Sequence, residues 1–318
     1  TGGLRHEQTR VRSRFWYMPV TQAGEQIGQW QVSHSRFSVV LPSVFLTWRP
    51  DEAAVVRASL WRSYSRPAMN QLGGGSWLEV DEPGSVTLTQ GNPDLKPILA
   101  TNLDLQYQRL TSRGGWAISA WHKAMEHYMF ENGGSYAGAV ARPLGGTKII
   151  MPQNGGKARI SGLQAEGHWR ISPVFDPQSR FEVSASVTRQ WSRADLGSAD
   201  YGRRTVMQSA PDWLASASLS YERGPVRLML QSRYTGAFLS DYDTLGAPGD
   251  WDNQWIRPVL NTDLSGHLRM SPSARIEFGV SNLANALSYE AHVGRHSRVI
   301  SSRVHTGRQI RLGLRAQL

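Results

Sequence analysis

The feature that most restricts the fold of this chain is a series of segments in which apolar and polar side chains alternate. In residues 102–108, Leu103, Leu105 and Tyr107 alternate with polar residues, as in a β-strand, whose successive side chains point to opposite faces. Segments with this period recur to the end of the chain. They predict about twelve strands, near residues 3–17, 37–48, 54–64, 102–108, 116–130, 157–171, 180–191, 212–222, 225–235, 258–269, 274–281 and 307–318.

The connections between these segments alternate strictly between long and short. Outer-membrane barrels of bacteria have this pattern, because their periplasmic turns are short and their extracellular loops are long. A soluble β-sandwich has no reason to sort its connections in this way. We therefore expect an all-β fold, an antiparallel transmembrane β-barrel with both chain ends on the periplasmic side. Long extracellular loops are expected near residues 18–36, 65–99, 131–156, 193–211, 236–257 and 283–306.

Two other observations bear on the membrane interpretation. No run approaches the roughly 20 apolar residues that a membrane helix needs, but a barrel strand meets lipid only with alternate residues. Twelve Trp and ten Tyr suit aromatic girdles, although sugar binding or core packing would also use them. In a soluble sandwich, Leu264, Phe278 and Leu312 would lie in a dry interior between two stacked sheets, whereas in a membrane barrel they would meet lipid.

The net charge of +10 raises the question of a nucleic-acid partner. Lys and Arg are spread singly, without a basic block, so we expect no nucleic acid. A polar lumen and loops that face acidic lipopolysaccharide account for the charge better. The absence of cysteine excludes disulfides and thiolate chemistry. The first ten residues lack the apolar region of a signal peptide, so we expect the natural chain to begin further upstream.

Several motifs, in their order and spacing, resemble the C-terminal half of a TonB-dependent outer-membrane receptor. No single motif decides the resemblance, but the ordered set covers nearly the whole chain. The motifs are LPSVFLTWRP (41–50), VVRASLWRSYSRP (55–67), GNPDLKP (91–97), NLDLQYQ (102–108), ISAWHKAMEHYMF (118–130), NGGKARISGLQAEGHW (154–169), GVSNLANALSYE (279–290) and GRQIRLGLRAQL (307–318).

The resemblance implies that residues 1–318 form the C-terminal portion, roughly the last twelve strands, of one barrel domain of about 22 strands around a plug. An open sheet edge in lipid leaves backbone groups unpaired, at a cost of several kcal/mol each. We therefore expect the plug, the segment that contacts TonB and the signal peptide to lie upstream. A smaller closed barrel is the alternative. Family members usually end in an aromatic residue that the barrel assembly machinery reads, whereas this chain ends in Leu318.

The resemblance also implies an active transporter and not an enzyme. Its loops would capture a scarce small solute, and energy would come through the TonB complex. A carbohydrate is favoured as the solute and a siderophore comes next, because the motifs are similar in style to those of a carbohydrate-associated branch of the family. A passive pore without a plug, and a soluble all-β carbohydrate-binding module, remain as alternatives.

The run GNPDLKP and the preceding Arg-Pro pair are interpreted as structural. Gly91 is expected to supply an unusual backbone angle, and prolines are expected to fix the start of the next strand. The residues of this family motif are Arg66, Pro67, Gly91, Asn92, Pro93, Leu95 and Pro97.

The long loops hold the candidate solute-binding residues. Loop 236–257 combines aromatic rings, which stack on sugar faces, with carboxylates, which accept hydrogen bonds from hydroxyl groups. Packing within the loop, or a place in an aromatic girdle, is an equally good explanation. Trp77 and Tyr201, from neighbouring long loops, complete the set. The candidates are Trp77, Tyr201, Asp241, Tyr242, Asp250, Trp251 and Trp255.

The last long loop contains His292, His296 and His305, of which two are four residues apart. That spacing suits a metal only on a helix, and interleaved arginines disfavour a cation, so a solvated loop is the better interpretation. No serine elbow or carboxylate pair indicates catalysis. Haem receptors of the family that this chain resembles carry a histidine between the Arg-Pro and Asn-Pro motifs. Residues 68–90 contain none, which disfavours a haem receptor. We expect no metal and no cofactor.

Overall fold

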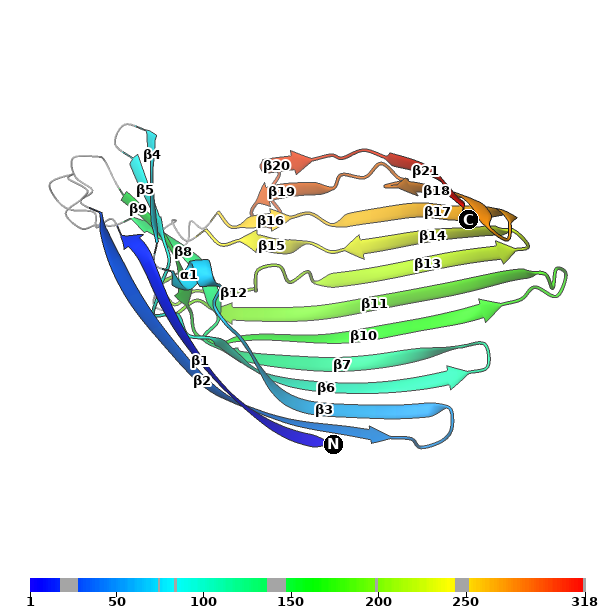
Figure 1. The fold of residues 1–318 in the computed structure, drawn as a ribbon, viewed down its shortest axis with the longest axis horizontal. Helices are drawn as coiled ribbons and strands as arrows, with labels where there is room; N and C mark the ends of the chain where they lie inside the picture. Colours follow the sequence, from blue (N-terminus) through cyan, green and yellow to red (C-terminus); the bar gives the residue numbers. More distant parts are fainter. Residues whose placement is uncertain are drawn as a thin grey trace.

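The computed structural model describes residues 1–17, 28–73, 75–82, 85–135, 147–197, 200–243 and 252–316. Twelve long strands form one continuous sheet, with each strand antiparallel to its neighbours (Figure 1). In sheet order they are β1 (Gly2–Tyr17), β2 (Gln29–Trp48), β3 (Ala54–Ser65), β6 (Ile98–Thr111), β7 (Gly114–Glu126), β10 (Ala158–Ile171), β11 (Ser179–Asp195), β13 (Trp213–Arg223), β14 (Val226–Thr235), β17 (Val259–Ser271), β18 (Ala274–Ser281) and β21 (Gln309–Ala316). The prediction of about twelve antiparallel strands is confirmed.

The sheet is curved and open. Within the described residues, β1 pairs only with β2 and β21 only with β18, so two strand edges are left (Figure 1). The short β12 (Arg204–Thr205) pairs with the C-terminal end of β11. No helix among the described residues is long and apolar enough to cross a membrane.

The strand register collects the apolar side chains on one face of the sheet. One row runs across five strands through Leu219, Leu230, Leu264, Val280 and Ile310. This alignment arises because every strand keeps its period of two and each turn holds the neighbouring strand in step.

No second sheet covers this apolar face in the described part of the chain. Phe278 pairs with Leu312, and Leu312 is 77% exposed. The smaller sheets lie at one end of the large sheet instead of against it (Figure 1). The soluble sandwich, which needs a dry interior at these positions, is therefore excluded.

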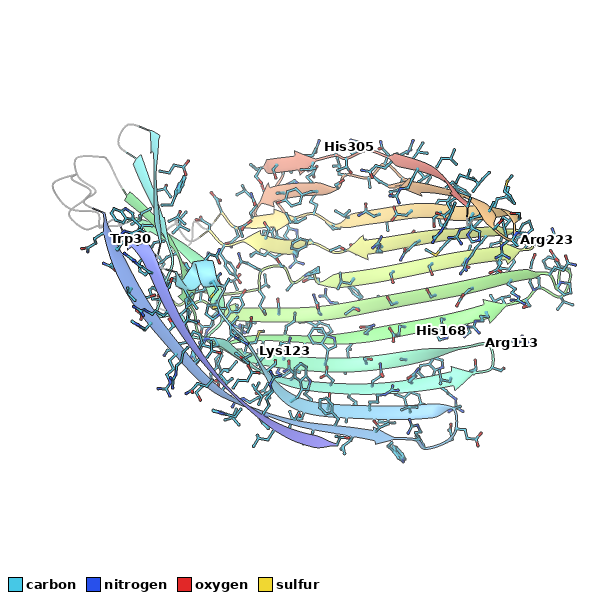
Figure 2. The ribbon with its side chains drawn as sticks, viewed as in Figure 1. Trp30, Arg113, Lys123, His168, Arg223 and His305 are labelled. Atoms are coloured by element: carbon cyan, nitrogen blue, oxygen red, sulfur yellow. The ribbon has the colours of Figure 1, made fainter. Side chains whose placement is uncertain are left out.

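The two ends of the sheet differ. At one end the strands are joined by the short segments 49–53, 112–113, 172–178, 224–225 and 272–273. Figure 2 shows Arg113 and Arg223 near this end and Trp30 at the other. At the other end lie α1 (Met69–Leu72) and two four-stranded sheets. The first sheet contains β4 (Ser76–Glu82), β5 (Ser85–Gln90), β8 (Met129–Ser135) and β9 (Thr147–Asn154). The second contains β15 (Phe238–Asp241), β16 (Gln254–Ile256), β19 (Tyr289–Val293) and β20 (Ile300–Val304).

The structure differs from the sequence-based strand limits at this second end. β2 begins at Gln29, so it takes up part of the loop expected at 18–36. The strand expected to run to residue 130 ends at Glu126, because His127 adopts a positive φ of 58° and turns the chain into β8. Most of the expected long loops contain short strands, since residues such as Leu88, Leu196 and Leu239 are buried there.

Candidate functional site

The GNPDLKP run ties the segment between β3 and β6 to its surroundings. Leu95 is 1% exposed and packs with Phe37 of β2 and Leu72 of α1. The Asn92 side chain accepts a hydrogen bond from the Asp94 backbone N–H (3.0 Å) and donates one to the carbonyl oxygen of Pro152 (3.0 Å). The run therefore connects β9 to β2 through Pro152 and Phe37.

The other residues of this motif lie in the same framework. Pro67 and Pro97 are buried, and the carbonyl oxygen of Pro93 accepts a hydrogen bond from Ser35 (2.8 Å). Arg66 pairs with Glu7 at 3.5 Å. The Gly91 backbone N–H donates to the carbonyl oxygen of Gly75 (3.3 Å), and its expected backbone angle stays a prediction.

An aromatic cluster forms the base of the loops that follow. Tyr128, Phe130, Leu196, Leu239 and Tyr242 are all buried in it. The Tyr242 hydroxyl donates to the carbonyl oxygen of Val206 (2.8 Å) and lies 3.3 Å from the Tyr128 hydroxyl. Burial raises the pKa of both phenols, so they stay neutral and act as hydrogen-bonding groups.

A buried ion pair braces this cluster. Asp200 and Arg203 are 1% and 6% exposed, and their charged groups lie 2.6 Å apart. Arg203 also donates to Asn253 (3.3 Å) and lies over the Tyr242 ring at 5.6 Å. Desolvation raises the pKa of Asp200, and the charge of Arg203 opposes this. The pair connects the β11–β12 turn to the loop between β15 and β16.

A second polar network lies in the sheet of β15, β16, β19 and β20. Glu290 is 7% exposed and accepts hydrogen bonds from His292 (2.9 Å) and Arg303 (2.7 Å), while Arg257 lies 3.3 Å away. His292 is 1% exposed, and its other ring nitrogen lies 3.0 Å from the carbonyl oxygen of Ser297. The solvated-loop interpretation is therefore wrong for His292, which forms part of β19.

Acid pH should loosen this small sheet. The hydrogen bond from His292, and to a smaller extent the hydrogen bond from Arg303, holds the pKa of Glu290 below its usual 4.5. A lowered folded-state pKa contributes stability that is present above pH 4.5 and is lost as the pH falls through the folded value. We expect amide hydrogen exchange in residues 289–304, corrected for intrinsic rates, to accelerate below about pH 4.5. Glu290→Gln should remove the dependence, and equal protection of the wild type at pH 6 and pH 3 would contradict the prediction.

The structure brings only some of the candidate solute-binding residues together. Asp241, Tyr242 and Trp255 lie on or beside the β15–β16 hairpin. Tyr242 is buried, and Trp255 packs against the aromatic cluster with the Arg295 guanidinium 5.0 Å from its ring centroid. Asp250 and Trp251 lie outside the described residues.

Trp77 and Tyr201 stand apart from this group. They are 69% and 70% exposed, on β4 and on the turn after β11, and Tyr201 has a positive φ of 54°. No described contact joins either of them to the hairpin. Sequence reasoning missed Tyr128, Asp200 and Glu290, because their partners lie elsewhere in the chain and their own neighbours give no signal.

The sequence itself also matches a known family. Residues 1–283 match the family model described as TonB dependent receptor-like, beta-barrel. The chain belongs to the TonB-dependent receptor family. Members of this family are receptors and transporters, and their barrels lie in the outer membrane of Gram-negative bacteria. The apolar face of the TonB-dependent barrel therefore meets lipid, and the polar face lines the lumen.

Solved TonB-dependent barrels have the same fold. The ferric enterobactin receptor PfeA from Pseudomonas aeruginosa gives a TM-score of 0.64 at 17% identity, over 92% of this chain and 42% of that protein. The FrpB iron transporter from Neisseria meningitidis gives 0.61 at 16%, over 98% and 42%. The copper transporter OprC gives 0.67 at 16%, over 99% and 45%. This chain thus spans less than half of each relative's length. No curated protein sequence matches it.

On the polar face of the TonB-dependent barrel, polar side chains of neighbouring strands contact one another. Asp104 accepts hydrogen bonds from Ser59 (3.2 Å) and Trp61 (3.0 Å). Arg233 of β14 pairs with Asp263 of β17 at 3.3 Å. Cross-strand pairing of this kind permits charged residues in the middle of a membrane-spanning strand, because they face the lumen and not lipid.

Proposed function

We propose that this chain is part of an outer-membrane receptor that captures a scarce solute and imports it with energy supplied through TonB. The single observation that carries the proposal is the asymmetry of the sheet. Two small sheets and an aromatic cluster lie at one end, and only short turns lie at the other. Binding residues on loops held by a rigid scaffold are a common arrangement for capture.

The asymmetry also supports an orientation. In the proposed orientation the short turns face the periplasm, and the connections near 18–36, 65–99, 131–156, 193–211, 236–257 and 283–306 are extracellular. The two open edges and the 42% coverage of the ferric enterobactin receptor support residues 1–318 as the C-terminal portion of a larger barrel. Outer-membrane lipid, lipopolysaccharide and the barrel assembly machinery are its proposed partners besides TonB and the solute.

A carbohydrate is the favoured solute. Trp77 and Tyr201 are exposed aromatic residues suited to stacking on sugar rings, and Asp241 offers a carboxylate at the same end of the large sheet. Several loop cations are already paired, which leaves less positive charge for an anionic chelate: Arg203 with Asp200, Arg303 with Glu290 and Arg295 with Asp212. A siderophore is the second candidate, because two similar structures are a ferric enterobactin receptor and an iron transporter.

Substitution of the aromatic candidates tests the binding site. We expect Trp77→Ala, Tyr201→Ala and Trp251→Ala, combined in the full-length receptor, to weaken solute binding at least about tenfold, because truncation of one aromatic anchor can cost about 2 kcal/mol. Phe175→Ala is the matched control, since Phe175 is 92% exposed in a short turn at the opposite end. Titration calorimetry would measure both. Unchanged affinity of the triple variant would remove these residues from the site.

Growth of a deletion strain tests the transport proposal and identifies the solute. A receptor for carbohydrate should be required on one scarce carbohydrate, and a siderophore receptor should be required only under iron limitation. Uptake should stop when TonB is deleted. Uptake that continues without TonB would favour a passive pore and would contradict the proposed energy coupling.

A further inference from the structure

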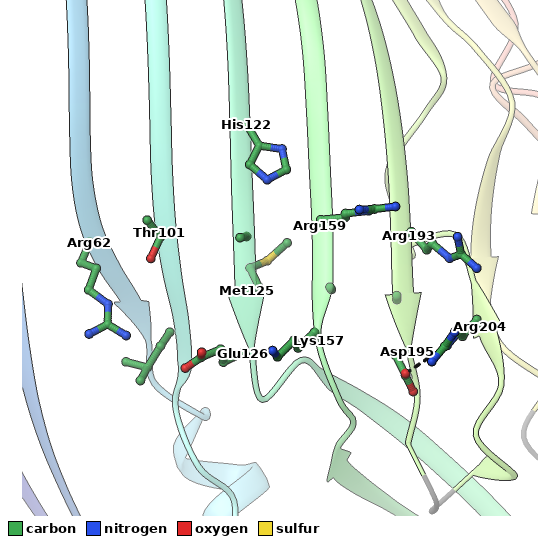
Figure 3. Close-up of a pocket in the computed structure, with 14 residues that line it drawn as sticks. Arg62, Thr101, His122, Met125, Glu126, Lys157, Arg159, Arg193, Asp195 and Arg204 are labelled. Carbon is green, nitrogen blue, oxygen red and sulfur yellow. Dashed lines mark hydrogen bonds and ion pairs between the residues drawn. The ribbon is translucent and has the colours of Figure 1, made fainter.

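Positively charged side chains gather in a groove across five neighbouring strands of the large sheet. The groove has a volume of about 500 Å³, and it is lined by Arg62, Lys157, Arg159, Arg193 and Arg204, from β3, the start of β10, the end of β11 and β12 (Figure 3). Two carboxylates, Glu126 and Asp195, also line it, and Asp195 pairs with Arg204 at 3.3 Å. Among the described ion pairs, none involves Arg62, Lys157, Arg159 or Arg193.

The strand period places this groove on the outside of the barrel. Arg62 lies two residues after Leu60, and Arg159 lies four residues before Leu163, so each shares the face of its apolar neighbour. Leu60 and Leu163 are 53% and 52% exposed on the face that meets lipid. Arg193 shares the face of Val187 on β11 in the same way.

The groove lies beyond the apolar residues of its strands, where we expect lipid headgroups. At about 3.3 Å per residue, Arg62 is about 7 Å and Arg159 about 13 Å along the strand from those two leucines. The polar region of a bilayer extends about 5–7 Å beyond each side of the hydrocarbon core. The cations therefore stand where the apolar band ends, and they lie at the end of the sheet that carries the small sheets.

The lining suits a phosphate that is attached to an amphiphile. Guanidinium groups bind phosphate through paired, charge-assisted hydrogen bonds, which makes arginine suited to this anion. Leu99 and Ala124 add apolar surface to the same groove. A free inorganic anion would use the cations but not this apolar surface.

The basic surface continues along the same face. The Arg189 guanidinium lies 5.3 Å from the ring centroid of Trp191 and 5.0 Å from that of Trp213. On β1 and β2 the exposed face carries Arg10, Arg12, Arg14, His34 and Arg36 in register. A row of cations above an apolar band fits an anionic membrane surface.

We infer that the groove of Arg62, Arg159 and Arg193 binds the phosphate groups of a phosphorylated glycolipid in the outer leaflet. The inference rests on the outer-membrane location and identifies where the lipopolysaccharide of the proposed function would bind. Solute uptake is a separate property, because this groove faces lipid and not the lumen.

Native mass spectrometry of the full-length receptor with added lipid A tests the inference. We expect bisphosphorylated lipid A to bind at least about tenfold more tightly than its fully dephosphorylated form, because the form without phosphate loses the charge-assisted bonds. Arg62→Gln, Arg159→Gln and Arg193→Gln combined should reduce binding of the phosphorylated form by a similar factor. The matched control removes the cations Arg57, Lys123 and Arg180, which lie on the lumen face of β3, β7 and β11, and it should bind as the wild type does.

Each outcome bears on the inference. Equal binding of the two lipid A forms by the wild type would overturn it, and this comparison needs no variant to fold. Equal loss in the lumen-face control would assign the effect to net charge and not to the groove. If millimolar inorganic phosphate displaced the lipid completely, the groove would be a site for free anions. Retained solute binding by the groove variant would separate this site from the transport function.

Discussion

An arginine in place of Leu230 should prevent stable assembly of the barrel in the outer membrane. Leu230 lies in the middle of the apolar row, between Leu219 and Leu264. A charged side chain on the lipid face near the bilayer centre costs about 2–4 kcal/mol, whereas lumen positions tolerate charge. This cost is a large fraction of the stability of a typical domain.

The next residue supplies the control for Leu230→Arg. Gln231 points to the lumen opposite Asp263, so Gln231→Arg adds the same side chain next to a carboxylate. We expect the folded, heat-modifiable species on gels to be lost for Leu230→Arg and kept for Gln231→Arg. Equal folded yield of the two variants would mean that the apolar face does not meet lipid.

Removal of one partner of the buried ion pair should open the β11–β12 turn. Asp200→Ala leaves the charge of Arg203 in a site where its side chain is 3% exposed. Breaking a buried pair in this way costs about 3–5 kcal/mol, because one charge loses its compensation. We expect hydrogen exchange to accelerate in residues 194–206 and 239–243 and to stay unchanged in β17 and β18.

A charge-free pair tests whether the effect is electrostatic. Asp200→Leu combined with Arg203→Met keeps much of the buried volume without a charge, so protection should recover in large part. Wild-type protection in Asp200→Ala would show that Arg203 is compensated by its contact with Asn253 and the ring of Tyr242. In that case the ion pair would not be what holds the turn.

The candidate site was predicted less completely than the strands. The loop composition drew attention to Asp241, Tyr242 and Trp255, which do lie on or beside one hairpin. It gave no sign that Tyr242 is buried, since its hydroxyl lies against Tyr128, a residue 114 positions earlier. The solute-binding role of these residues stays a prediction.

The strands of the large sheet and their order could be predicted from local patterns in the chain. β18 covers residues 274–281 as expected, because the alternation of side chains and the short turns are local properties of the chain. The folding of the long connections, and the groove that Arg62, Arg159 and Arg193 line, became visible only in the folded molecule. These arrangements depend on pairs of residues far apart in the sequence, and no local pattern encodes which distant segment will pack against which.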